Sequence, residues 1–537
     1  MASTAGTETR NRSARRTRRA AAAVVTALGL VGTATACGAG TSGGGAGDST
    51  VVVAVAGDPG SLSPTTTLVS TALAMNSFAY DTLVHFDADG SPVPGVAEKW
   101  SATTTTATFT IRPGVTCEDG SALTAEDVAA EYNHIADPKN QSPMLGLSVP
   151  VTAVAKADEA ARTVTITTKK PAPFIVQMSR LLPLLCEKSL AAPTALARTT
   201  DASGPYRLTE AVPGDHYTYV KRDGYSWGPR GSTGAGLPGK VVFKVVANES
   251  TAANLLMAGQ INIALINGAD QDRLDAAKVK YRSMEALFGQ LLFNQAAGRP
   301  TADLAVRKAL VSVLDLGQLG NVATGGKGKP ATSIGEIAPT PCSGDTVKGN
   351  LPAHDTAKAA TALTEAGWTK SGGTWTKDGR PLALGLSYAT NQGPQVASAV
   401  ELAVQQWTAF GVKATAKPKG SSSIVGTLAG GDWDIAWAPI GVTLPDQLTQ
   451  FYDGPPPPKG NNFGSVANPE YHRLAARASA KDGASGCDLW DAADAALVKN
   501  VDIVPVVSKA NRYYGKGVTF EVDGGGIVPS TLRRSAG

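Results

Sequence analysis

Short apolar strands alternate with helical segments along most of residues 50–510, and this alternation constrains the fold more than any other feature. The run at 51–56 is wholly apolar and is followed by Gly57-Asp58-Pro59-Gly60, so it predicts a buried strand that ends in a turn. Alternating strands and helices are typical of α/β domains. Further strands are predicted at 107–112, 163–168, 241–247, 261–266, 434–437 and 503–507.

Helices are predicted where apolar residues recur every three or four positions. Thr124 is a favourable N-cap, Asp127 falls in the first turn, and apolar periodicity then continues to Ile135. A chain of 537 residues exceeds what one hydrophobic core can organise, so roughly two or three packed units are expected. Other helices are predicted at 251–258, 303–319, 356–366 and 394–410.

The first 36 residues have the composition of a secretory signal. Residues 10–19 are rich in arginine, and residues 20–36 carry no charge. These 17 residues are short and weakly apolar for a membrane anchor, because a bilayer span needs about 20 apolar residues. We therefore interpret residues 1–36 as a signal peptide.

The segment Ala34-Thr35-Ala36-Cys37 resembles a bacterial lipobox, in which the cysteine is lipidated and becomes the first mature residue. Residues 38–47 contain six glycines and no large side chain, which suits a flexible tether to a membrane. We predict a lipid at Cys37, a tether over 37–49 and a location on the extracytoplasmic face of the cell membrane. The alternative is ordinary cleavage after Ala36 with a free Cys37.

Four further cysteines remain, at positions 117, 186, 342 and 487, and none has the CxxC spacing of zinc or thioredoxin-type motifs. In an exported protein an even number of cysteines indicates disulfides, and four allow three pairings. We favour Cys117–Cys186 and Cys342–Cys487, which keep each bridge within one half of the chain.

The net charge of +4 belongs to the leader, because residues 1–36 hold six arginines and one glutamate. The remaining body is close to neutral and lacks the long-range field that gathers nucleic acid, so no nucleic-acid partner is expected. The five histidines are scattered, and no catalytic or nucleotide-binding motif follows a predicted strand. No cofactor, metal or catalytic residue is therefore predicted.

Several motifs in order resemble the extracytoplasmic solute-binding proteins of ABC importers, family 5, the peptide/nickel class. They include YDTLV at 80–84, PGVAEKW at 94–100, FTIRPGVTCEDGSALTAEDV at 109–128 and RDGYSW at 222–227. Most of these residues also suit turns, helix caps and core positions, so they identify a scaffold more than a binding site.

The resemblance implies a two-lobed α/β fold, similar to type II periplasmic binding proteins, with an extra domain inserted in the first lobe. Two crossing strands would join the lobes, and ligand would bind in the cleft between them. We place lobe I at 50–265 with the antiparallel insert at about 86–190, lobe II at 266–500, and the return to lobe I at 501–537. The disulfide pairing favoured above agrees with this plan.

In peptide-binding relatives a Trp-x-x-Asp segment meets the ligand, and its acid pairs with the α-ammonium of the peptide. Here Trp437 matches the aromatic position, whereas the acid position falls on Ile440 and the next acid is Asp446. The resemblance thus implies that Trp437, Ile440 and Asp446 face the ligand, and Asn294 after the strand ending at Phe293 is a further expected contact.

We predict a binding lipoprotein that captures oligopeptides or dipeptides and delivers them to the permease subunits of an ABC importer. Two alternatives stay open. The same scaffold could carry a non-peptide solute, such as an oligosaccharide, a nickel chelate or a natural product. The protein could instead be a secreted enzyme or sensor, although no nucleophile–base pair can be named.

Overall fold

The computed structural model describes residues 49–87, 90–335, 337, 340–524 and 526–535. The predicted signal peptide, Cys37 and the tether before residue 49 lie outside these ranges. Within them, no helix combines the length and the apolar character that a membrane span requires.

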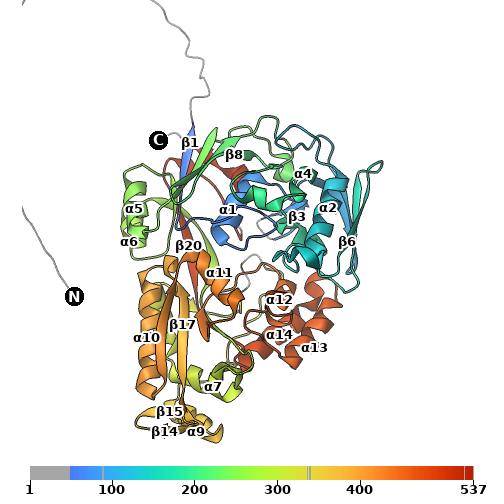
Figure 1. The fold of residues 1–537 in the computed structure, drawn as a ribbon. Helices are drawn as coiled ribbons and strands as arrows, with labels where there is room; N and C mark the ends of the chain where they lie inside the picture. Colours follow the sequence, from blue (N-terminus) through green and yellow to red (C-terminus); the bar gives the residue numbers. More distant parts are fainter. Residues whose placement is uncertain (1–48, 88–89, 336, 338–339, 525, 536–537) are drawn as a thin grey trace, which may run out of the picture. The chain divides into compact units, whose positions relative to one another are not determined.

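One large mixed sheet of 11 strands runs through both lobes, with strand order β18-β17-β19-β12-β20-β11-β1-β10-β9-β8 and with β13 paired to β20. Lobe I is built on one end of this sheet and lobe II on the other (Figure 1). The lobe I strands are β1 (Thr50–Val55), β8 (Tyr206–Val212), β9 (His216–Lys221), β10 (Lys240–Val245) and β11 (Ile263–Ile266). The lobe II strands are β13 (Lys329–Pro330), β17 (Ala383–Ala389), β18 (Lys413–Lys419) and β19 (Ile435–Trp437).

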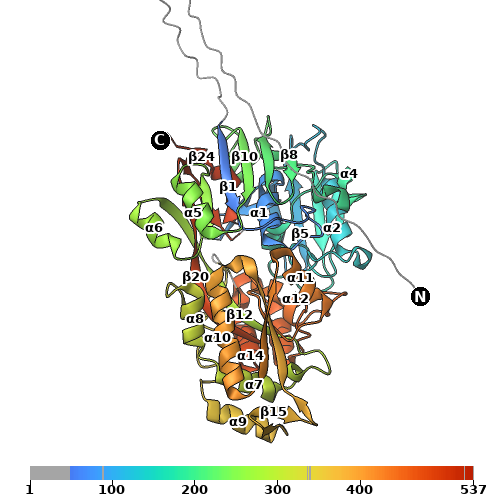
Figure 2. The same ribbon diagram turned by 60° about the vertical axis from the view of Figure 1, so that its left-hand side comes forward.

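Two long strands, β12 (Lys280–Phe293) and β20 (Ile503–Gly515), join the lobes. They pair antiparallel from Lys280↔Gly515 to Leu292↔Ile503. At one end β20 also pairs with β11 of lobe I, and at the other end β12 pairs with β19 of lobe II. Figure 2 shows both strands between the lobe that carries β1 and the lobe that carries α10. The expected two-lobed architecture with two crossing strands is confirmed.

Lobe I packs its helices against β1, which lies parallel between β10 and β11. The run that predicted a fully buried strand is buried only in part: Val51 and Val53 join Phe78 and Phe243 in one core, whereas the residues between and after them are half-buried or exposed. The lobe I helices are α1 (Ser70–Ala79), α5 (Glu249–Met257) and α6 (Asp270–Ala276).

A four-stranded antiparallel sheet forms a separate layer of lobe I, in the order β4-β5-β7-β6. Helix α2 (Ala125–Ala136) packs on it and begins at Thr124, whose side chain accepts from the Asp127 N–H in a reciprocal capping box. The Cys117–Cys186 disulfide joins two segments of this layer, as predicted. Its strands are β4 (Ala97–Ala102), β5 (Thr106–Ile111), β6 (Val154–Asp158) and β7 (Thr163–Thr167).

Lobe II surrounds the parallel strands β18, β17 and β19 with helices. The Cys342–Cys487 disulfide is also formed and ties residue 342 to the first residue of α14. The main helices are α7 (Leu304–Val313), α8 (Leu316–Thr324), α9 (Thr356–Glu365), α10 (Pro394–Phe410), α11 (Ser421–Gly430), α13 (Pro469–Ser479) and α14 (Cys487–Lys499).

Two expectations about single elements need correction. The helix predicted at 303–319 is two helices, because Leu314 is extended and the Asp315 carboxylate caps a new helix by accepting from the Gln318 N–H at 2.9 Å. The strand predicted at 503–507 continues to Gly515, because β20 has pairing partners on both sides.

Short elements complete the described chain. They are the strands β2 (Val84–Phe86), β3 (Pro92–Pro94), β14 (Thr369–Ser371), β15 (Thr374–Lys377), β16 (Arg380–Pro381), β21 (Val518–Thr519), β22 (Val522–Asp523), β23 (Gly526–Ile527) and β24 (Arg533–Arg534), and the helices α3 (Ile175–Met178), α4 (Glu187–Leu190) and α12 (Thr449–Tyr452).

Candidate ligand-binding site between the lobes

The lobes touch along a seam where amide side chains of lobe II reach the main chain of lobe I. Gln447 Nε2 donates to the Leu147 carbonyl at 2.7 Å, and Asn461 Nδ2 donates to the Pro143 carbonyl at 3.0 Å. Both donors come from the region that follows β19. The seam therefore lies beside the segment in which the sequence places the ligand.

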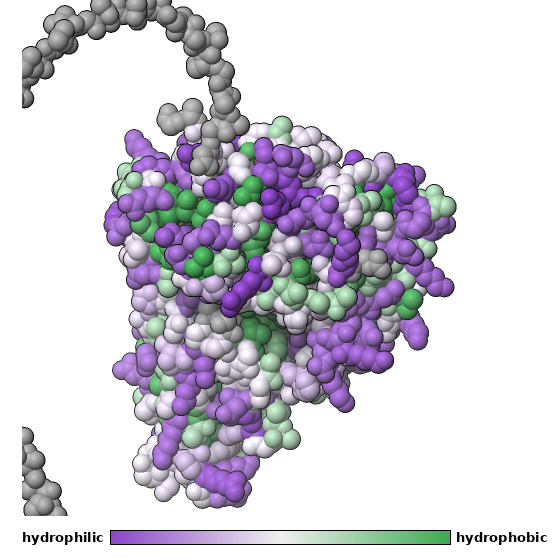
Figure 3. Space-filling model, turned by 45° about the horizontal axis from the view of Figure 1, so that its top comes forward, coloured by the Kyte–Doolittle hydropathy of each residue, from purple (hydrophilic) through white to green (hydrophobic). Residues whose placement is uncertain are grey.

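Apolar contacts reinforce the seam through the short helix α3 of lobe I. Its residues Ile175 and Val176 join the core of the antiparallel layer, whereas Phe174 and Met178 join an apolar cluster of lobe II. That cluster includes Val442 and Leu444. Apolar side chains also gather in a hollow on the face shown in Figure 3, on a surface that is otherwise mostly hydrophilic.

We call residues 437–448 the interlobe segment. It starts as the end of β19, which pairs with β12 through Trp437↔Leu291. It then crosses a second loop of lobe II. There the Val442 N–H donates to the Gly335 carbonyl at 2.9 Å, and the Val442 carbonyl accepts from the Ile337 N–H at 2.7 Å. Main-chain bonds thus hold the segment on two sides.

Trp437 is fully buried in the main core of lobe II. Its indole lies over Gly289 of β12, so closely that a Cβ on Gly289 would meet Cζ2 at 2.6 Å. The indole N–H has no hydrogen-bond partner among the described residues. The ring is therefore beneath the interlobe segment, and its contact with a ligand stays a prediction.

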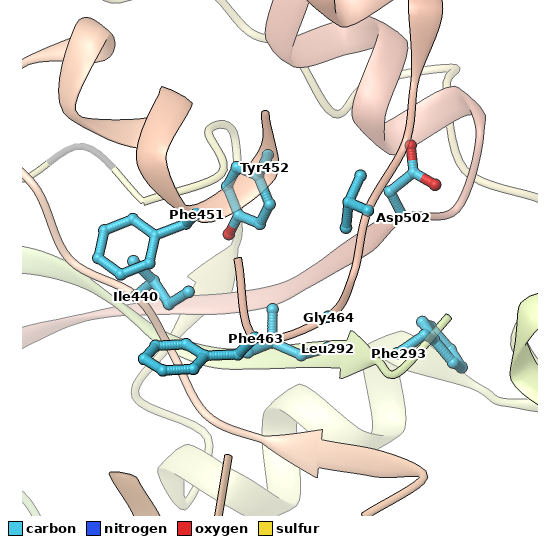
Figure 4. A pocket seen from close by; sticks show the side chains of 9 residues that line it. Leu292, Phe293, Ile440, Phe451, Tyr452, Phe463, Gly464 and Asp502 are labelled. Atoms are coloured by element: carbon cyan, nitrogen blue, oxygen red, sulfur yellow. The ribbon is translucent and has the colours of Figure 1, made fainter. Parts of the chain in front are cut away.

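Ile440 is half-buried and lies beside a small cavity of about 10 Å³, which matches the space of one water molecule. The side chains of Phe451, Ile440 and Phe463 lie on one side of this cavity and Asp502 on the other (Figure 4). The Asp502 carboxylate accepts from Arg307, Asn468 and Asn500, so it is already paired within lobe II. The surroundings of Ile440 are apolar.

Asp446 begins the turn that ends the interlobe segment, and its Oδ1 is buried without a hydrogen-bond partner in the described structure. Burial raises the pKa of this carboxyl to about 7, although main-chain N–H groups of residues 446 and 447 oppose the rise. The group therefore holds a proton to a much higher pH than an exposed aspartate does. It is a titratable acid near the seam and differs from a permanently charged one.

Asn294 lies at the end of β12, and its side chain is committed to the protein. Nδ2 donates to the Gly431 and Trp433 carbonyls at 3.1 and 2.9 Å, and Oδ1 accepts from Ala296 N–H at 3.1 Å. These bonds hold the turn that leads into β19. The structure thus places Trp437, Ile440 and Asp446 on one continuous segment and Asn294 at the opposite end of β19.

Comparison with known families decides what this scaffold is. The model of the bacterial extracellular solute-binding proteins, family 5, matches residues 91–458. The chain belongs to this family. Family 5 proteins bind solutes outside the cytoplasm for transport. This agrees with the two-lobed fold and with the resemblance drawn from the sequence motifs.

Individual family 5 relatives cover different parts of the chain. Protein XP55 of Streptomyces lividans is 30% identical over 63% of this chain and 61% of its own length. The periplasmic murein peptide-binding protein MppA of Escherichia coli is 24% identical over 85% of this chain and 87% of its own length. The match therefore spans less than two thirds of XP55 and most of MppA.

A solved family 5 structure resembles the whole described body. It is a substrate-binding protein from Microbacterium hydrocarbonoxydans in complex with 4-hydroxybenzoate hydrazide, 27% identical, with a TM-score of 0.78. The similarity covers 91% of this chain and 100% of that structure. The fold and the relative placement of its elements are thus those of a family 5 binding protein.

Sequence reasoning missed a cation at the seam of this family 5 scaffold. Arg180 follows α3, is nearly buried, and pairs with the Asp523 carboxylate at 2.7 Å while its guanidinium lies 4.9 Å from the centre of the Phe86 ring. Gly524, next to Asp523, approaches Thr443 of the interlobe segment. A single arginine within an apolar run carries no sequence signal for such a position.

The described residues contain no cluster of three or more histidine, cysteine, aspartate or glutamate side chains arranged to hold a metal ion. Ionisable groups beside the seam include the Arg180–Asp523 pair and Asp446. In this family 5 protein the seam therefore offers apolar surface, main-chain groups, one paired cation and one acid of raised pKa.

Proposed function

We propose that the protein is the extracytoplasmic binding component of an ABC importer and captures peptides between its lobes for delivery to the permease. The observation that carries this proposal is the position of the interlobe segment at a seam between two lobes that are joined by two strands. A lobe that turns on two strands can close on a ligand and bury it. The peptide-binding relative MppA, matched over 85% of the chain, supports peptide as the solute class.

We infer that a free peptide amino terminus contributes little to binding. Ile440 supplies no charge where peptide-binding relatives have an acid, and Asp446 is only partly ionised at pH 7 because burial raises its pKa. A buried ammonium needs a charged partner, since an unpaired buried ion is very costly. Peptides should therefore be held mainly through main-chain groups and apolar side chains.

A second candidate is a small aromatic solute. The side chains of Phe451 and Phe463 beside Ile440 are apolar and could contact an aromatic ring if the cavity there, now about 10 Å³, widened when the lobes open. The Microbacterium hydrocarbonoxydans relative was solved with an aromatic hydrazide. We propose no catalytic activity of the protein toward either solute.

Thermal-shift titration of the purified chain separates these candidates. The panel contains tripeptides with free and acetylated amino termini, 4-hydroxybenzoate hydrazide, an oligosaccharide and a nickel–histidine chelate. A ligand present at 100 times its dissociation constant should stabilise the protein by about 2.7 kcal/mol. Stabilisation by both tripeptides supports peptide binding. Stabilisation by the hydrazide alone supports the second candidate. If neither the tripeptides nor the hydrazide stabilises the protein, both candidates are refuted.

We further propose that Cys37 carries the lipid that holds the protein at the extracytoplasmic face of the membrane. The lipobox-like sequence and the glycine tether support this reading. Cys37→Ser should move the protein from the membrane fraction to the soluble fraction. A Cys37→Ser protein that stays as firmly in the membrane fraction as the parent contradicts the proposal.

We also propose lobe I at 50–265 with its insert at about 86–190, lobe II at 266–500 and a return at 501–537. The crossing strand β20 begins next to the second border. Helix α6 (Asp270–Ala276) still packs on α5 of lobe I, so the first border belongs closer to the start of β12 at Lys280. Limited proteolysis followed by mass spectrometry tests the division, because first cuts should fall near the borders and outside the sheet strands.

A further inference from the structure

The pairing of β12 with β20 is irregular at the residues of β12 that support the interlobe segment. Its pairing with β20 is regular from Lys280 to Leu287, skips Phe288, and resumes at Gly289↔Val507 and Gln290↔Pro505 with two register shifts. Bulges of this kind bend a strand and redirect its side chains, and they are frequent beside functional sites. The irregularity lies on a strand that joins the lobes.

The bulge places Gly289 directly against the indole of Trp437. A Cβ at this position would lie 2.6 Å from Trp437 Cζ2 and 2.9 Å from Val507 Cγ1, closer than non-bonded carbons approach. Only glycine lets the indole of Trp437 rest on the strand. The bulge thus sets the depth at which β19 and the start of the interlobe segment pack.

Gln290 is the second residue at the bulge. Its side chain is fully buried, Oε1 accepts from Ile440 N–H at 2.9 Å, and Nε2 donates to the Ile334 carbonyl at 2.6 Å. Its main-chain carbonyl also accepts from Ala438 N–H at 3.1 Å. Because Pro439 has no N–H, the Gln290 amide takes over where the main-chain ladder with β19 stops.

The amide therefore joins three pieces of chain: the strand β12, the loop at Ile334 and the interlobe segment at Ile440. The two loops are also bonded to each other through Val442 and Gly335. At Gly335 a side chain is excluded, since a Cβ would lie 2.2 Å from the Ile440 carbonyl oxygen. Both loops are thus held in position by hydrogen bonds to one side chain, that of Gln290 on a crossing strand.

We propose that Gln290 is a positioning residue for ligand binding: it attaches the main chain at Ile440 to a strand that bends when the lobes close. Movement of the crossing strands is thereby passed directly to the segment that meets the ligand. That the segment meets a ligand rests on the proposed function. The attachment itself is a property of the ligand-free protein and can be tested without any ligand.

The first test is hydrogen–deuterium exchange of the ligand-free full chain. Gln290→Met keeps the length of the side chain but removes both bonds, so exchange in fragments spanning 440–444 should rise about tenfold, the loss expected for one hydrogen bond. Fragments spanning β11 (263–266) should be unchanged. Unchanged exchange at 440–444, or an equal rise throughout the chain, overturns the proposal.

The second test uses Gln290→Glu, which discriminates positioning from general packing. A protonated glutamate can accept from Ile440 N–H and donate to the Ile334 carbonyl, whereas an ionised one repels that carbonyl oxygen and so pushes apart the two loops that meet at the side chain. Protection at 440–444 should match the parent at low pH and fall below it as pH rises. Gln271→Glu is the matched control, because Gln271 is also buried and donates to the Ile266 carbonyl at 2.8 Å in lobe I. Equal pH profiles at 440–444 for Gln290→Glu and Gln271→Glu overturn the proposal.

A binding arm then separates this inference from the proposed function. Dissociation constants for trialanine and for 4-hydroxybenzoate hydrazide are measured with the parent and Gln290→Met. A rise of at least tenfold for whichever probe binds the parent supports the positioning role, and an unchanged constant overturns it. If neither probe binds the parent, the proposed function fails while the exchange results still decide the role of Gln290.

Discussion

Glu131 of α2 should make the protein less stable as pH rises through neutrality. Its side chain is fully buried; Oε2 accepts from Leu185 N–H at 2.9 Å, and Oε1 has no partner among the described residues. Burial raises the pKa of this carboxyl to about 8 from an ordinary 4.5, and the nearby Asp127 carboxylate adds to the rise. The folded protein therefore holds this proton more tightly than the unfolded chain.

The sign and size follow from linkage. Because the folded pKa is raised, the stabilising contribution is complete below about pH 4.5 and is lost as pH rises through about 8. Each pKa unit corresponds to about 1.4 kcal/mol, so the loss across this window approaches roughly 5 kcal/mol. Glu131→Gln has the shape of the protonated acid and cannot ionise. It should match the parent near pH 4.5 and be more stable by several kcal/mol at pH 8.

The assay is urea unfolding without reductant, followed by circular dichroism, at intervals from pH 4.5 to 9. The informative quantity is the difference in unfolding free energy between Glu131→Gln and the parent at each pH. Glu126→Gln serves as control, because Glu126 is exposed in the first turn of the same helix. A flat difference for Glu131→Gln, or an equal slope for Glu126→Gln, would refute the reasoning.

Three further predictions concern the disulfides and the interlobe segment. Alkylation of the folded protein without reductant should add no label at Cys117 or Cys342. Reduction should cost about 4–5 kcal/mol per bridge on the chain-entropy model, as unfolding curves with and without reductant would show. The affinity of the parent for a cationic peptide should increase as pH rises past about 7, because Asp446 ionises. Asp446→Asn should abolish that pH dependence, and calorimetric affinities that change equally with pH in parent and variant would contradict the prediction. Trp437→Ala should weaken peptide binding by roughly 1–3 kcal/mol if the ring supports the ligand, and equal affinities in fluorescence titrations would assign the ring to the core alone.

Local features of this fold could be predicted from the sequence because they depend on residues close in the chain. The capping box at Thr124 needs only Asp127, and α10 ends where Gly411 stops it. The family motifs then supplied the architecture, whereas the disulfide pairing followed from keeping each bridge within one half of the chain. The break between α7 and α8 was missed although its signal, Asp315 within an apolar stripe, was present.

The interior of the site could not be predicted in the same way. The body of β12 has no regular alternation of apolar residues, and its strand conformation depends on β20, more than 200 residues later. Gln290 meets Ile334 and Ile440, which are 44 and 150 residues away. The sequence singled out residues 437–446 of the interlobe segment, but the depth of Trp437 and the bonds of Asn294 follow from tertiary packing.

The central place of β20 in the large sheet bears on how the chain folds during synthesis. Residues 503–515 insert between β11 and β12, strands made some 200 residues earlier. Until they leave the ribosome, both older strands present unpaired main-chain edges, which favour pairing with other chains. Contacts between such distant residues also slow folding, because a long loop must close first. The pairing that links the two halves of the sheet is thus complete only after residues 503–515 have been made.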